Sequence, residues 1–119
     1  MNDSKTTISR AVESDAFGIQ SVLKEASRKM YFDCGYSEED FEKRFKDSSS
    51  EEGVAKCAKN ISILSANEKF LVARQDGEIV GILYVEKGKD NILHALYVLP
   101  KFQGKGIGML LWNEAKGFI

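Results

Sequence analysis

Apolar residues recur at helical spacing in several stretches of this chain and alternate or cluster in others. The first helical stretch carries its apolar residues on one face: Ile19, Val22, Leu23, Ala26 and Met30. Ser14 or Asp15 is placed to cap its start. Gly35 follows as a residue that can adopt the left-handed conformation of a helix end. The pattern therefore predicts one long helix between these signals.

Three further helices follow from the same kind of pattern. Ser37 and Asp40 have the spacing of a capping box at the start of a second helix. Ser49 and Glu52 have that spacing for a third helix, whose apolar face is Val54, Cys57, Ala58, Ile61 and Leu64. The last helix runs from about Gly106, with Ile107, Leu111, Ala115 and Phe118 on one face.

Strand signals separate these helices. Residues 5–11, 70–74 and 78–86 are rich in branched or aromatic side chains. Asp76-Gly77, between the last two segments, is the dipeptide typical of a two-residue hairpin turn. Strands joined by such a turn are antiparallel. The pattern therefore predicts an α/β (α+β) protein with a mostly antiparallel sheet flanked by helices.

A fourth strand is expected at residues 92–99, where Pro100 stops it. Side chains alternate between the two faces of a strand. His94, Leu96 and Val98 are therefore expected on one face, and the intervening residues on the other.

Composition narrows the class of protein. The chain has 119 residues, of which 43% are hydrophobic and 29% charged, as in a single soluble domain. A net charge of −1 shows no excess of basic residues of the kind that binds nucleic acid or a membrane surface. No secretory leader or membrane span is evident. Cys34 and Cys57 match no metal-binding spacing, so no metal is expected and both are read as reduced thiols of a cytoplasmic protein.

The loop after the fourth strand carries the strongest candidate chemistry. Residues 103–108 read QGKGIG and lead into the last helix, where unpaired backbone N–H groups favour an anion such as a diphosphate. A P-loop would need Ser or Thr after Lys105, and a dinucleotide fingerprint would need a third glycine at Met109. Neither pattern is complete.

A different pattern fits in full. Gln-x-x-Gly-x-Gly after a strand and a proline resembles the pyrophosphate loop of the GCN5-related N-acetyltransferase (GNAT) family. The residues that carry the resemblance are Leu96, Tyr97, Val98, Pro100, Phe102, Gln103, Gly106 and Gly108. Residues 8–16 look like that family's first strand and helix entry, and residues 70–85 like its second and third strands. Within the family the chain looks most similar to the polyamine (PaiA-like) branch.

The resemblance implies an N-acetyltransferase that uses acetyl-coenzyme A (acetyl-CoA) and a primary amine of a small molecule, such as a polyamine. It assigns cofactor binding to Leu96, Tyr97, Val98, Gln103, Gly104, Lys105, Gly106, Ile107, Gly108 and Met109. In this scheme the strand backbone pairs with the pantetheine arm, and the loop N–H groups hold the diphosphate. Gln103 ties the loop in place and Lys105 adds charge.

A catalytic base is also expected, because an amine must lose a proton before it attacks. Family members often carry a carboxylate where this chain has His94, its only histidine. An ordinary imidazole titrates near neutral pH and suits the role. The alternatives are a plain polar residue at a strand start, or Glu86 as the base. Likewise, the acidic residues between 33 and 52 are either a solvated face or an attractant for a cationic amine.

Family members usually continue for further strands and a helix beyond this point. We therefore expect residues 1–119 to be a single, partial domain that lacks the C-terminal strands and the tyrosine that protonates the leaving thiolate. That loss would uncover apolar residues of the last helix: Ile107, Leu110, Leu111, Trp112 and Phe118. A homo-oligomer such as a dimer is expected to cover them. The alternative functions are a non-catalytic module that binds coenzyme A or only a partner chain, and a nucleotide-binding protein of another family.

Overall fold

A computed structural model describes residues 5–48 and 50–119. Within them the strands form one antiparallel sheet in the order β1-β2-β3-β4. Their bounds are Thr7–Arg10 for β1, Glu68–Gln75 for β2, Glu78–Glu86 for β3 and Ile92–Val98 for β4. Neighbours in the sequence are thus neighbours in the sheet, and β4 lies at one edge.

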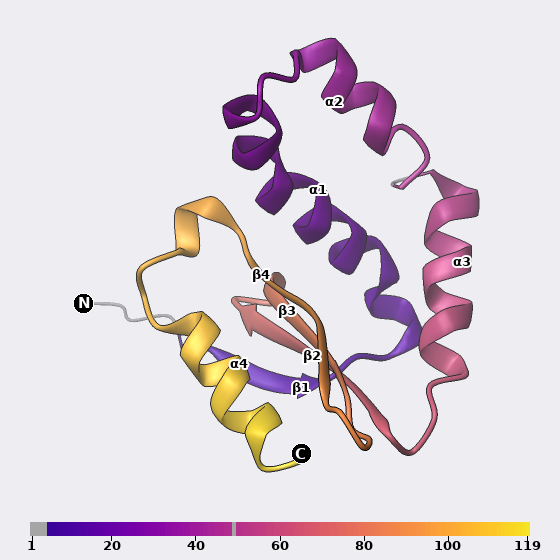
Figure 1. The fold of residues 1–119 in the computed structure, drawn as a ribbon, viewed down its shortest axis with the longest axis vertical. Coiled ribbons are helices and arrows are strands. Elements are labelled where there is room, and N and C mark those ends of the chain that lie inside the picture. Colours follow the sequence, from indigo (N-terminus) through magenta and orange to yellow (C-terminus); the bar gives the residue numbers. More distant parts are fainter. Residues whose placement is uncertain (1–4, 49) are drawn as a thin grey trace.

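Helices cover both faces of this sheet (Figure 1). Their bounds are Ala16–Asp33 for α1, Glu38–Phe45 for α2, Glu51–Ser62 for α3 and Ile107–Lys116 for α4, with short 3₁₀ turns η1 at Glu13–Asp15 and η2 at Pro100–Phe102. α1 and α3 pack on one face and α4 on the other, while α2 extends from the far ends of α1 and α3. The expected mostly antiparallel sheet flanked by helices is confirmed.

Local signals in the sequence account for several element ends. Asp76 and Gly77 have φ values of 51° and 82°, as a tight hairpin turn requires. Gly35 ends α1 with φ of 93°. At α2 the Asp40 N–H donates to Ser37 Oγ at 3.1 Å, and the Ser37 N–H donates to Asp40 Oδ2 at 3.4 Å. The predicted capping box is therefore present.

The predicted cap of α1 was wrong in its chemistry. Asp15 is the N-cap residue, but its side chain makes no capping hydrogen bond. Its carboxylate instead accepts from the Val12 N–H at 2.9 Å and forms an ion pair with Arg74 of β2. With 5% of its surface exposed, Asp15 joins the start of α1 to the sheet.

The predicted cap of α3 also differs. Ser49 lies outside the described residues, and the N-cap is Ser50, whose Oγ accepts from the Gly53 N–H at 3.0 Å. Gly53 is required here for space, because a Cβ at this position would lie 2.0 Å from the Asp47 carbonyl oxygen. The connection between α2 and α3 is therefore packed tightly against the start of α3.

α4 packs closely on the sheet at a glycine. A Cβ on Gly81 of β3 would lie 3.2 Å from Leu111 Cδ1 and 3.3 Å from Ile107 Cγ2. Ile107 and Leu111 are consequently buried, and Trp112 and Phe118 pack against the same cluster. The expectation that these residues are uncovered was wrong for the two buried ones. Leu110 does remain 45% exposed.

The face under α1 and α3 has its own core. Val72 and Ile82 of the sheet pack there against Ile19 and Val22 of α1 and Ile61 of α3. Cys57 lies at the margin of this cluster, and both cysteines are free thiols, as expected. No helix of the described residues is long and apolar enough to span a membrane.

Candidate functional site

The start of α4 is an open helix end. Gly106 is its N-cap, in the left-handed conformation with φ of 82°, and no side chain caps it. The Leu110 N–H donates to the Gly106 carbonyl at 3.0 Å. The N–H groups of residues 107–109 precede that bond, where the positive end of the helix dipole lies. This cradle (residues 103–109) suits an anion.

The loop before the cradle is fixed to β4. The Gln103 side-chain N–H donates to the Val98 carbonyl oxygen at 3.0 Å. Phe102 packs against the core under α4, and its ring lies 5.4 Å from Lys101 Nζ and 5.6 Å from Lys105 Nζ. Two cations are thus held beside the open helix end, on a loop whose position is set by the strand and the core.

β4 presents an unpaired backbone edge, because within the described residues it pairs only with β3. Tyr97 packs into the core under α1 and α3, whereas Val98 packs into the core under α4. Leu96 is 37% exposed. An extended ligand can add to such an edge through main-chain hydrogen bonds. The edge leads directly into the cradle.

A bulge in β4 changes the face on which His94 lies. Tyr84 pairs with Ala95 and Val85 pairs with Leu93, so His94 is an extra residue opposite the β3 strand. Its ring stacks on Tyr84, on the α1–α3 face. The predicted grouping of His94 with Leu96 and Val98 was therefore wrong, because strict alternation does not hold across a bulge.

His94 is held by two contacts. Its ring centroid lies 4.6 Å from that of Tyr84 at an interplanar angle of 25°, and Tyr84 stacks in turn on Phe70 at 5.1 Å. Its Nε2 lies 2.9 Å from Glu86 Oε1. The two residues considered as alternative bases are therefore in contact with each other. The imidazole remains partly open to solvent, with 35% of the side chain exposed.

Tyr84 also donates its hydroxyl proton to Glu68 of β2. Burial, followed by the hydrogen bond to Glu68, raises the pKa of Tyr84 to about 12. The same bond, with a second from the Ser65 N–H, lowers the pKa of Glu68. At neutral pH the pair is therefore a neutral phenol beside a carboxylate.

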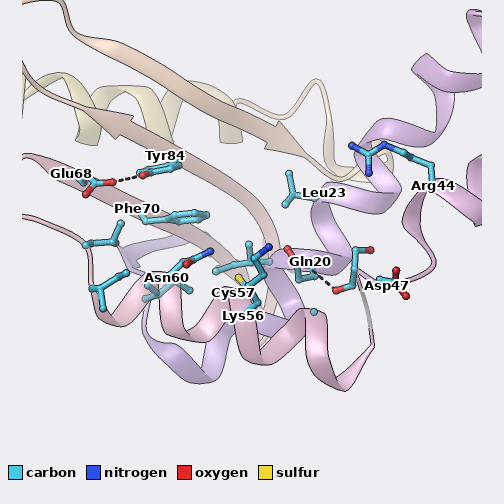
Figure 2. A pocket seen from close by; sticks show the side chains of 16 residues that line it. Gln20, Leu23, Arg44, Asp47, Lys56, Cys57, Asn60, Glu68, Phe70 and Tyr84 are labelled. Atoms are coloured by element: carbon cyan, nitrogen blue, oxygen red, sulfur yellow. Dashed lines mark hydrogen bonds between the residues drawn. The ribbon is translucent and has the colours of Figure 1, made fainter.

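A cavity of about 630 Å³ opens beside these residues, on the face covered by α1 and α3 (Figure 2). Glu68, Phe70 and Tyr84 line one end, and Arg44 and Asp47 line the other. No local pattern in the sequence predicts this cavity, because its walls come from segments far apart in the chain.

Three of the acidic residues between 33 and 52 form ion pairs with basic residues of α1. Glu38 lies 3.0 Å from Arg28, Glu42 lies 3.1 Å from Lys24, and Asp33 lies 2.6 Å from Lys29. Most of these groups are exposed and contribute little stability. The arrangement favours the interpretation of a solvated, ion-paired face over that of a site for a cationic amine.

Residues 32–119 match the model of the acetyltransferase (GNAT) domain. The chain belongs to the GNAT acetyltransferase family. The match spans most of the sequence and includes β4, the cradle and α4. It confirms the resemblance that the strand, proline and glycine loop indicated.

Solved GNAT structures have the same fold. The PaiA N-acetyltransferase from Thermoplasma acidophilum, in complex with coenzyme A, superposes with a TM-score of 0.74 and is 25% identical; the match covers 95% of this chain and 70% of that one. A GCN5-related N-acetyltransferase from Rhodopseudomonas palustris gives a TM-score of 0.66 at 23% identity, covering 98% and 67%.

A GNAT family acetyltransferase from Brucella melitensis, in complex with acetyl-CoA, gives a TM-score of 0.64 at 23% identity, covering 97% of this chain and 68% of that one. The chain thus spans roughly two thirds of the length of these enzymes. No curated relative matches the sequence.

Proposed function

We propose that this GNAT domain transfers an acetyl group from acetyl-CoA to a primary amine of a small molecule. The observation that carries the proposal is the uncapped, left-handed start of α4 directly after the free edge of β4. Two of the similar structures contain coenzyme A or acetyl-CoA, which supports the same cosubstrate here.

The residues proposed to hold the cofactor are those of the edge and the cradle: Leu96, Tyr97, Val98, Gln103, Gly104, Lys105, Gly106, Ile107, Gly108 and Met109. The backbone of 96–98 pairs with the pantetheine arm. The N–H groups of 107–109 donate to the diphosphate, and Lys105 adds positive charge. Gln103 keeps the loop in register with β4 through its bond to the Val98 carbonyl.

The acceptor amine is proposed to occupy the cavity at its Tyr84 end, next to the bulge of β4. Tyr84 lines the cavity and pairs with Ala95 of β4, so an amine there lies on the opposite side of β4 from the cradle helix. The bound cofactor supplies an activated thioester. The polyamine acceptor expected from the sequence remains one member of this substrate class.

His94 is proposed as the base that makes the amine neutral. With Nε2–H donating to Glu86, the imidazole keeps the lone pair of Nδ1 for the amine proton. The amine nitrogen then forms the new C–N bond while the C–S bond breaks. The sulfur leaves as a thiolate, and the second proton of the nitrogen is released to solvent. Stacking on Tyr84 fixes the plane of the ring during this transfer.

Calorimetric titration with acetyl-CoA tests the cofactor site. We expect micromolar binding by the native chain. Gly106→Glu should abolish that binding, because a carboxylate then occupies the anion site, while circular dichroism shows the fold retained. A folded native chain that does not bind acetyl-CoA would refute the proposal.

Turnover with a panel of amines tests the chemistry. His94→Gln should lower kcat/KM by about a hundredfold, as loss of a general base does, with acetyl-CoA affinity unchanged. Glu86→Gln should lower kcat/KM by a smaller factor, because the Glu86 carboxylate only orients the His94 ring. Binding of acetyl-CoA without turnover by the native chain would instead favour a non-catalytic module that binds the cofactor.

A further inference from the structure

The cavity on the α1–α3 face is lined by equal numbers of positive and negative groups. Among the described residues, Glu68 and Asp47 supply two carboxylates, and Arg44 and Lys56 supply two cations. Figure 2 shows Glu68 at one end of the cavity and both Arg44 and Asp47 at the other, with Lys56 between the two ends. Lys56 would repel a second ammonium group, and Asp47 offsets the charge of Arg44. The cavity therefore favours an amine whose body is uncharged.

The stretch between the two ends offers hydrogen-bonding groups that the protein leaves unused. Gln20 of α1 and Asn60 of α3 line this stretch together with Lys56. Gln20 Nε2 donates to the Ser48 carbonyl oxygen at 2.9 Å, which leaves Gln20 Oε1 as an acceptor. The side chains of Lys56 and Asn60 have no ion pair or hydrogen bond within the part of the chain that the structure describes. Donors and acceptors thus lie close together, and a hydroxyl group can satisfy both.

The floor of the cavity is apolar. Ile19 and Ile61 line the floor with only 1% and 8% of their surfaces exposed, and Phe70 lines it at the sheet end. Lys56 and Asn60 are exposed and form part of the rim. A ring that carries C–H groups on its faces and hydroxyl groups along its edge matches this arrangement. The C–H face covers the apolar floor, and the hydroxyls reach the polar rim.

We propose that the acceptor is an amino sugar: a primary amine on a neutral, hydroxylated ring. The amine lies at the Tyr84 end of the cavity, beside His94, and the ring hydroxyls bind Lys56 and Asn60. This inference rests on the proposed function and names its substrate class. The cavity volume of about 630 Å³ lies within the range of small-molecule sites.

Binding of the acceptor is measured without the cofactor, by amide shifts of the ¹⁵N-labelled native chain. The first two probes are D-glucosamine and cyclohexylamine, at about pH 6, where both amines are protonated. Glucosamine should bind about tenfold more tightly than cyclohexylamine, because its hydroxyls gain hydrogen bonds that the hydrocarbon ring cannot make. It should also bind more tightly than a diamine, 1,6-diaminohexane, a zwitterion, 6-aminohexanoate, and a neutral peptide amine, glycylglycinamide.

Variants of the rim locate the contact. Asn60→Ala and Lys56→Met should each weaken glucosamine binding about fivefold, the loss expected for one hydrogen bond, and leave cyclohexylamine binding unchanged. Unchanged cyclohexylamine binding also shows that the fold is retained. Lys59→Met is the matched control on α3, because Lys59 lies outside the cavity wall, and Asn113→Ala is the control on α4. Both controls should bind glucosamine as the native chain does.

The inference is overturned if no probe binds, or if cyclohexylamine, the diamine, the zwitterion or the peptide amine binds the native chain at least as tightly as glucosamine. Equal losses of glucosamine affinity in the rim variants and their controls would also overturn it. Acetyl-CoA titration of the same samples keeps the two proposals separate. A chain that binds acetyl-CoA but shows no preference for glucosamine retains the proposed function and loses only this inference.

Discussion

Gly106 is the residue whose replacement most directly tests the cradle. It holds φ of 82° at the N-cap of α4, and a Cβ built on it meets no atom within 4 Å. The cost of Gly106→Ala is therefore a backbone cost and not a clash. Left-handed backbone disfavours a residue with a Cβ by roughly 1–2 kcal/mol.

Part of that cost is offset in the unfolded chain, where alanine has less freedom to lose than glycine, by about 0.4–1 kcal/mol. The net expectation is a loss of roughly 1 kcal/mol of unfolding free energy. With a typical urea dependence, the denaturation midpoint falls by about 0.3–1 M. If the strain is relieved by moving the loop, apparent affinity for acetyl-CoA falls by about fivefold.

The other end of the same helix offers a matched control. Gly117 has φ of −71°, and its nearest non-neighbour atom would lie 3.8 Å from a Cβ. Gly117→Ala should thus be neutral or slightly stabilising. Gly106→Asn should lie between Gly106→Ala and the native chain, because asparagine tolerates the left-handed region. Urea denaturation followed by circular dichroism measures all three, and calorimetry measures acetyl-CoA binding.

Equal stability of Gly106→Ala and the native chain would refute the backbone argument, as would equal losses at Gly106 and Gly117. If Gly106→Ala is destabilised but binds acetyl-CoA with native affinity, the left-handed residue is needed for the stability of the helix start and not for the orientation of the N–H groups of residues 107–109.

Gly53→Ala should lower the unfolding free energy by roughly 1–3 kcal/mol in thermal denaturation, because its Cβ would lie 2.0 Å from the Asp47 carbonyl oxygen; a native-like midpoint would contradict the tight packing. Tyr84→Phe should raise the pKa of Glu68 in an NMR titration, because the hydrogen bond from Tyr84 is the largest cause of the lowered pKa. The folded chain should then lose part of the stability that the ionised Glu68 contributes above the ordinary carboxyl pKa and that disappears on acidification. An unshifted Glu68 pKa would contradict this. We also predict self-association through the apolar residues that α4 leaves exposed, which Leu110→Glu should abolish in light scattering; a native monomer at high concentration would count against it.

Much of the local structure was predictable because its causes lie within a few residues. Asp76-Gly77 forms a tight turn since both positions need positive φ, and Ser37 with Asp40 closes a capping box over one turn. The glycine loop and its helix follow the same logic. Gln103, three residues before Gly106, reaches back to the end of the strand just before it. The cradle and the family resemblance therefore came from the sequence.

The features that the sequence did not determine depend on contacts between distant segments. The bulge at His94 exists only in the register of β4 against β3, and it reversed the face expected from alternation. Asp15 had the signature of a helix cap, but the approach of Arg74 from β2 drew its carboxylate into an ion pair. The cavity on the α1–α3 face needs α1, α2, α3 and the sheet together. Local propensity thus decided the elements and the anion cradle, whereas tertiary packing decided which side chains face the proposed acceptor.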